Sequence, residues 1–134
     1  MIAASALLSS AMMTALLSSL GAGSKALLYS GTRPATPGGA PGGSAVGQVL
    51  FADIAGTIEA GALVLAPGPV AVALASAAPT WARVVDGSGD WLFDCDARMG
   101  AAADTGQELI IGSGTVLQAG VAIQIVSGQF SAMP

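Results

Sequence analysis

Histidine is absent from this chain, and charged side chains are scarce. Four Lys or Arg and eight Asp or Glu residues carry all the charge among 134 residues. Without histidine, neither a Ser-His nor a Cys-His pair can activate a nucleophile. The basic residues are scattered at Lys25, Arg33, Arg83 and Arg98, whereas binding a phosphate backbone takes several clustered cations. We therefore expect a protein that is not an enzyme, with no catalytic residue, cofactor, metal, small-molecule substrate or nucleic-acid partner.

Cysteine occurs once, at Cys95, and this excludes a disulfide within the chain. The residue lies in an apolar, aromatic stretch between Asp94 and Asp96. A reactive thiol needs a nearby cation or histidine to lower its pKa, and acidic neighbours act in the opposite direction. We expect Cys95 to be a small buried hydrophobic residue.

Charge is also missing from the start of the sequence, where the first charged side chain is Lys25. A secretory signal begins with basic residues, which this stretch lacks. A membrane span needs about 20 mostly apolar residues, and serine or threonine interrupts the stretch at positions 5, 9, 10, 14, 18 and 19. We expect neither a signal peptide nor a span, and no membrane partner.

Hydrophobic residues, by contrast, make up 53% of the chain. A folded monomer of this mass exposes about 6,300 Å², and small soluble domains usually have about 25–35% charged residues on that surface. With 9% charged residues overall, two interpretations stay open. Either the protein is a stable, weakly soluble monomer, or copies of itself or other proteins cover much of its exterior.

Residues 1–22 are predicted to form an amphipathic helix. Leu8, Met12, Leu16 and Leu20 recur every four residues, and a Gly-Ala-Gly run at 21–23 ends the pattern. Such a helix either closes one end of the core or faces a partner. On the second interpretation, Leu8, Met12 and Leu16 are candidate interface residues.

Residues 31–43 are predicted to form an extended arm. Three prolines and five glycines fall within these thirteen residues, which excludes regular structure. Loops of this length in compact domains are usually functional or disordered. We expect the arm to become ordered on a partner, with Arg33, Pro34, Pro37 and Pro41 as candidate contacts.

Short strands are predicted over the rest of the chain, at 26–30, 46–52, 57–65, 70–75, 80–86, 90–95, 107–111 and 121–131. The stretch 57–65 is either one strand that bends at Gly61 or two strands that are split there. Gly87-Ser88-Gly89 marks the clearest hairpin, and in its second arm Trp91, Phe93 and Cys95 are expected to share a face. About eight strands after one helix favour an all-β fold. We expect residues 23–134 to form a single antiparallel two-sheet sandwich, jelly-roll-like or Greek-key.

Acidic residues cluster at Asp86, Asp90, Asp94 and Asp96. The run from Asp86 to Asp90 resembles the opening of a calcium loop, but it lacks the glycine at position six and the glutamate at position twelve that an EF-hand needs. Hairpin turn chemistry explains these residues without a ligand. Asp94 and Asp96 are expected to share a strand face, which leaves a carboxylate enzyme as the weakest alternative.

Leu27–Pro37 contains the motif Gly-Thr-Arg-Pro-Ala directly after a predicted strand and a predicted helix. This stretch and two others resemble a group of small structural proteins of tailed bacteriophages, in which a similar motif comes near the start and also follows a short helix. Pro79–Gly89 with Phe93-Asp94 is similar to the group's central hairpin. Glu108–Ile111 and Leu117–Gly120 match its final part, so the resemblance covers roughly residues 7–131.

The resemblance implies a virion protein, assembled in the host cytoplasm, with a structural role. A capsid decoration or cementing protein that contacts the major capsid protein and copies of itself is the first placement. A tail, collar or fibre-associated protein is the alternative. The chain departs from the group in its hydrophobic stretch Ala62–Ala78 and in Cys95. The arm suits a protein that reaches across a neighbour, and a small domain is too short for a fibre shaft.

Overall fold

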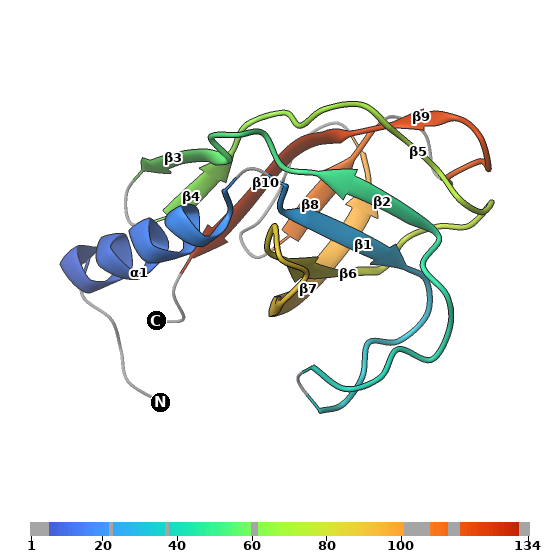
Figure 1. Ribbon diagram of the computed structural model, residues 1–134, viewed down its shortest axis with the longest axis horizontal. Helices are drawn as coiled ribbons and strands as arrows, with labels where there is room; N and C mark the ends of the chain where they lie inside the picture. Colours follow the sequence, from blue (N-terminus) through green and yellow to red (C-terminus); the bar gives the residue numbers. More distant parts are fainter. Residues whose placement is uncertain are drawn as a thin grey trace.

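A computed structural model describes residues 6–21, 23–36, 38–59, 62–100, 108–112 and 116–131. This part of the chain contains one helix, α1 (Ala6–Ser19), followed by ten strands (Figure 1). The strands are β1 (Lys25–Tyr29), β2 (Gly47–Leu50), β3 (Gly56–Glu59), β4 (Ala62–Leu65), β5 (Ala71–Val72), β6 (Trp81–Val85), β7 (Trp91–Met99), β8 (Glu108–Ile111), β9 (Ala122–Ile123) and β10 (Ile125–Ser131). A mostly β protein with an N-terminal helix is therefore confirmed.

Eight strands form one curled sheet in the order β2-β1-β6-β7-β8-β10-β4-β3, and β5 pairs with β9 in a small second sheet. The sheet is mixed, because β7 and β8 are parallel while its other neighbours are antiparallel. The prediction of an all-antiparallel arrangement was wrong at this pair, and a two-sheet sandwich is not confirmed. Alternation of side chains is the same in both directions, so the sequence pattern could not reveal strand direction.

The small sheet closes the curl of the large one. Gly47 of β2 bridges Ala73, directly after β5, and the Leu74 N–H donates to the Val46 oxygen at 3.0 Å. Because β5 pairs with β9, and one residue separates β9 from β10, hydrogen-bonded strands run in a closed ring. A Cβ at Gly68 would lie 2.2 Å from the Leu50 oxygen, so only glycine lets the chain pass between β2 and β10.

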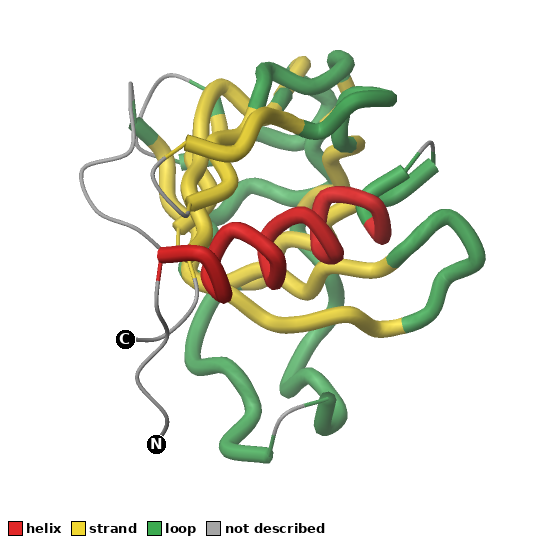
Figure 2. Tube along the Cα trace, turned by 90° about the vertical axis from the view of Figure 1, so that its left-hand side faces the viewer, coloured by secondary structure: helices red, strands yellow, loops and turns green. Residues whose placement is uncertain are grey.

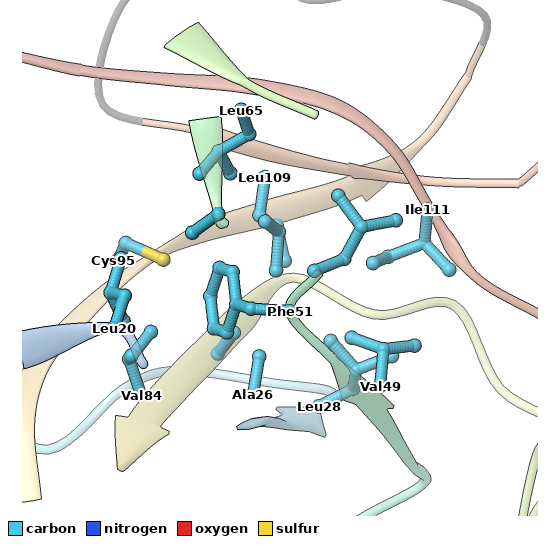
Figure 3. Packing of buried hydrophobic residues seen from close by; sticks show 14 of the residues in the cluster. Leu20, Ala26, Leu28, Val49, Phe51, Leu65, Val84, Cys95, Leu109 and Ile111 are labelled. Carbon is cyan, nitrogen blue, oxygen red and sulfur yellow. The ribbon is translucent and has the colours of Figure 1, made fainter. Parts of the chain in front are cut away.

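The core fills the inside of this ring. Figure 3 shows the Phe51 ring in its middle, with Leu20, Val84 and Cys95 around it. Burial of each large apolar side chain stabilises the fold by about 1.5–3 kcal/mol. Cys95 is confirmed as a buried residue, and burial raises the pKa of its thiol to about 12, with the nearby Asp96 charge adding to the effect.

Helix α1 packs against β3, β4 and β10, as Figure 2 shows from the side. Its buried side is formed by Met13 and Leu20, with Leu16 and Leu17 half-buried, whereas the predicted stripe residues Leu8 and Met12 are exposed. Residues 1–5 and 22 of the predicted helical segment lie outside the described residues. Of the helices in the described ranges, none has the length and apolarity to cross a membrane.

The predicted hairpin is confirmed between β6 and β7. Asp86 shapes its turn, because the Asp86 Oδ1 atom accepts hydrogen bonds from the N–H groups of Ser88 and Asp90 at 2.9 and 3.0 Å. A bulge next to the turn shifts the register between Val84 and Val85. It turns Trp91 to the outer face, away from the Cys95 side, so the predicted shared face of Trp91, Phe93 and Cys95 was wrong. An extra residue in a bulge changes which side the next side chain points to.

Candidate protein-interaction surfaces

The arm, residues 31–43, projects from the body between β1 and β2 (Figure 1). Its described residues, 31–36 and 38–43, are fastened to the outer face of β6 and β7. The Arg83 Nη2 group donates to the Gly39 oxygen at 2.7 Å, and the Thr80 hydroxyl donates to the Gly31 oxygen. The Trp91 ring lies against Gly38. The structure therefore orders the arm on its own sheet, whereas the sequence suggested ordering on a partner.

An ion pair between Arg83 and Asp94 forms the base on which the arm rests. These residues lie opposite each other on β6 and β7, where the Nε–Oδ1 and Nη2–Oδ2 distances are 2.9 and 3.1 Å. Their side chains are only 12% and 7% exposed. Two parallel hydrogen bonds fix the guanidinium in one orientation, which aims a further N–H of the Nη2 group at the arm.

The protonation state of Asp94 follows from these neighbours. Burial on its own raises the pKa of the carboxyl group. Hydrogen bonds from Arg83 and from the Trp91 indole N–H, together with the Arg83 charge, outweigh that effect and hold the pKa of Asp94 below its ordinary 3.8. The hydrogen bond to Asp94 also raises the pKa of Arg83. The pair is thus fully charged at neutral pH.

Aromatic rings continue this cluster across the sheet. Tyr29 of β1 stacks on Trp81 of β6, with ring centroids 4.5 Å apart and planes at 15°. The Arg83 guanidinium carbon lies 5.6 Å from the centroid of the Trp81 ring, within the range of a cation–π interaction. Tyr29 and Trp81 are both buried, although they lie on the outer face of the strands. We call Tyr29, Trp81, Arg83, Trp91 and Asp94 the clamp.

Asp96, two residues beyond Asp94, makes a different kind of ion pair. Its Oδ1 atom lies 2.8 Å from the Arg33 Nη2 atom of the arm, but both side chains are well exposed. Exposed pairs of this type contribute about 0–1 kcal/mol to stability.

Asp94 and Asp96 share one face, as predicted, yet each carboxylate binds an arginine. A general acid needs a raised pKa, and that of Asp94 is lowered, so the geometry suits holding the arm. In the ranges that the structure describes, no three acidic or cysteine residues could hold a metal ion.

A groove of about 560 Å³ opens where the arm meets β7. The arm contributes Thr32–Ala35 as one wall, and the sheet contributes Trp91, Phe93 and Asp94 as the other. Trp91 is the most exposed aromatic residue of the described chain, at 44%. Tryptophan and arginine are the residue types that most often dominate binding energy at protein interfaces. Sequence analysis had not selected Trp91, because its outward orientation depends on the bulge.

The residues predicted to contact a partner lie in two separate places. Leu8, Met12 and Leu16 are on α1, where Leu8 and Met12 are exposed and Leu16 is half-buried. Arg33, Pro34 and Pro41 are in the arm, where Arg33 is exposed and the two prolines are half-buried. Pro37 lies outside the described residues. The helix and the arm occupy different sides of the molecule in both views (Figures 1 and 2).

A third exposed surface is aliphatic, and the sequence did not suggest it. Val70, Val72 and Leu74, in and beside β5, are 62%, 54% and 63% exposed. Ala122 lies directly opposite Val72 on β9 and is also exposed. Val70, Val72 and Leu74 alternate with alanines along the chain, and these larger side chains point outward, whereas Ala73 points inward. The interior beside Ala73 is crowded, because a Cβ at its bridge partner Gly47 would lie 3.1 Å from the buried Ile123 side chain. We call Val70, Val72, Leu74 and Ala122 the aliphatic face.

The segments that form this face carry no charge. No charged residue occurs between Glu59 and Arg83, and none follows Glu108. The aliphatic face is built entirely from these two segments.

Protein-family models, curated proteins and solved structures were compared with the chain, and none of them matches it.

Proposed function

We propose that the protein is a structural component of a tailed-bacteriophage virion, and that it decorates or cements the capsid by binding the major capsid protein. The observation that carries this proposal is the arm, which projects from the body while the clamp holds its base. Its sequence, around Gly-Thr-Arg-Pro-Ala, is also one of the three stretches that resemble the phage group. In this proposal the closed ring is a rigid, jelly-roll-like body, and its curled sheet supplies the two layers of a sandwich.

A clamped arm is suited to binding a shell because it is ordered before the partner arrives. Ordering a loop during association costs binding free energy, and an arm that is already held avoids most of that cost. The groove beside the arm exposes Trp91 and Arg33 next to apolar walls. On a shell, many copies bound side by side can each tolerate a weak site, because linked contacts raise the effective concentration of the others.

The small number of charged residues predicts how such binding responds to salt. The chain has only four Lys or Arg and eight Asp or Glu residues, and the pairs Arg33–Asp96 and Arg83–Asp94 form within the chain. A partner therefore meets few charges. Binding should then depend on apolar burial, which salt does not screen. We expect the amount of protein on particles to change little between about 50 and 500 mM NaCl. Release at moderate salt would contradict this mode of binding.

Counting the protein on purified particles tests the placement. We expect hundreds of copies per particle, located on heads by labelled electron microscopy and quantified by mass spectrometry against the major capsid protein. A few copies on tails would instead support the alternative, a tail, collar or fibre-associated protein. Absence from both would overturn the virion proposal.

Shortening the arm tests which element makes the contact. A variant in which residues 32–42 are replaced by a short Gly-Ser linker should lose attachment to particles that lack the protein, as measured by co-sedimentation. Its far-ultraviolet circular dichroism should remain that of a β protein, because the core does not include the arm. The control is Ile54→Lys, on an exposed residue outside the arm, which should attach normally. Normal attachment of the shortened variant would show that the arm is not the contact.

The carboxylate enzyme remains the weakest alternative. A substrate or metal that bound the native state would raise the melting temperature. We expect no shift across a panel of divalent metals, sugars and phosphate esters. A reproducible shift that Asp94→Asn or Asp96→Asn abolishes would favour the enzyme.

A further inference from the structure

The aliphatic face is exposed and takes no part in the clamp, the arm or the groove. Three branched side chains there are each more than half exposed. Val121, in the segment that hydrogen bonds to Ala73, adds a further exposed valine at its rim. Burial of such groups against a partner would stabilise the complex by about 25 cal/mol for each Å² of apolar surface removed from water. Contiguous aliphatic surface of this kind marks a site of association.

The charge pattern restricts what can cover the face. It has no charged or aromatic side chain, and the nearby Ser76 hydroxyl already accepts a hydrogen bond from the Ala119 N–H. A charged or polar partner surface would therefore lose water there without gaining a hydrogen bond or an opposite charge. The partner surface must itself be apolar and uncharged.

A second copy of the chain supplies such a surface. The net charge of the protein is −4, so two copies repel each other wherever their acidic residues approach. The segments that form the aliphatic face contain no charged residue, and β5 and β9 lie at the top of Figure 1, at the other end of the molecule from the arm. Two copies that meet through this face bring together two uncharged surfaces and no acidic residue of either face.

We propose that the aliphatic face binds the same face of a second copy, so that the protein forms an isologous dimer. In such a dimer each residue contacts its symmetry equivalent or a residue near it. Val72 and Ala122 occupy the middle of the face, where the two-fold axis would pass. This inference deepens the proposed function, because it names the contact between neighbouring copies, but the dimer can be tested without particles.

Sedimentation equilibrium of the full chain between about 1 and 200 µM provides the test. We expect a reversible monomer–dimer equilibrium. The double variant Val72→Lys with Leu74→Lys should raise the dimer dissociation constant ~10-fold or more, since it places like charges across the interface. The control is Ile54→Lys, an aliphatic residue that is 74% exposed but lies outside the face. Its dissociation constant should stay within about twofold of the wild type.

Mixing two charge variants distinguishes same-face contact from any other geometry. Val72→Lys and Val72→Glu should each be mostly monomeric, because each repels its own copy. An equimolar mixture should recover association to within a few-fold of the wild type, because opposite charges then face each other. Failure of the mixture to recover would overturn the isologous arrangement.

Each remaining outcome also decides the question. A wild-type protein that stays monomeric at 200 µM, or a dimer that Ile54→Lys weakens as much as the double variant does, would overturn the inference. If the wild type is monomeric yet the double variant no longer attaches to particles, the face binds the capsid protein and the dimer is wrong. A dimer that is absent from virions would leave this inference standing and overturn the proposed function.

Discussion

The arm end and the small-sheet end of this molecule use polar and apolar residues in opposite ways. At the arm end, an ion pair and two stacked aromatic rings are buried on the outside of the sheet, beneath a loop of glycine and proline. At the small-sheet end, Gly47, Ala73 and Ile123 face inward while valine and leucine face water. Charged residues thus stabilise the chain's own shape at one end, and aliphatic residues are left exposed at the other.

The two ends should consequently respond differently to substitution. Removing one partner of a buried ion pair leaves the other charge uncompensated, which is strongly destabilising. Changing an exposed aliphatic side chain changes the folding free energy little. Four measurements probe this difference, beginning with the most protected group.

The rate at which the Cys95 thiol reacts shows whether the sheet under the arm keeps this residue buried. At pH 8, raising the pKa of its thiol from 9.0 to about 12 lowers the thiolate fraction about a thousandfold. We expect a thiol reagent to modify the native protein at least about a thousandfold more slowly than the urea-unfolded chain. The variant with the shortened arm should be equally protected, since Cys95 faces the core. Fast labelling of that variant would show that the arm end is held together by the arm itself.

Substitution of Asp94 should be the most destabilising change at the arm end. Asp94→Ala leaves Arg83 buried without its partner and should lower the free energy of unfolding by about 3 kcal/mol. The matched control, Asp96→Ala, removes an exposed pair on the same strand and should cost less than about 1 kcal/mol. Urea denaturation followed by tryptophan fluorescence measures both values. Equal losses would contradict the distinction between the two carboxylates.

Acid should weaken the same end. The folded-state pKa of Asp94 lies below its ordinary 3.8, so the unfolded chain binds a proton at a higher pH than the folded protein does. The stability from this group is fully present above that ordinary value, and it is lost as the pH falls from there through the lower, folded-state pKa. Urea denaturation between pH 7 and pH 2.5 should show this decline in the wild type. In Asp94→Asn that part of the decline should be missing, and parallel curves for the two proteins would refute the assignment.

Substitution on the aliphatic face should have the smallest effect on folding. Val72→Lys should change the free energy of unfolding by less than about 0.5 kcal/mol when measured at concentrations where the protein is monomeric. The same variant strongly impairs association in the inference above. A loss of several kcal/mol would mean that Val72 supports the ring, and the contrast between the two ends would fail.

Much of the local structure was predictable from the sequence. Turn residues and alternating apolar residues indicated most strands, the Gly87–Gly89 hairpin and the burial of Cys95, because these features depend on a few neighbouring residues. The common face of Asp94 and Asp96 followed from the two-residue period of a strand. The structure has two strands in 57–65, β3 and β4, on either side of Gly61, where the sequence had allowed a split, whereas the single strand predicted over 121–131 is divided into β9 and β10.

The remaining features depend on residues far apart in the sequence. Arg83 holds Gly39 although 44 residues separate them, and no local pattern encodes that contact. Trp91 turns outward because of a bulge opposite Val84 and Val85. Val70, Val72 and Leu74 face water because they alternate with Ala73, which takes the inward position opposite Gly47 and beside the buried Ile123. The candidate surfaces were therefore only partly predictable, since the arm was recognised from its composition while the clamp and the aliphatic face were not.

Closure of the ring also has a consequence for how fast the protein can fold. Lys25 pairs with Val85, Gly47 bridges Ala73, and β10 joins β8 to β4 only at the end of the described chain. Contacts between such distant segments make folding slow, because chain entropy is lost before the contacts compensate for it. The ring cannot close until the last strand has been synthesised, and until then the uncharged segments that form β4, β5 and β10 have no charge to keep them from pairing with other nascent chains.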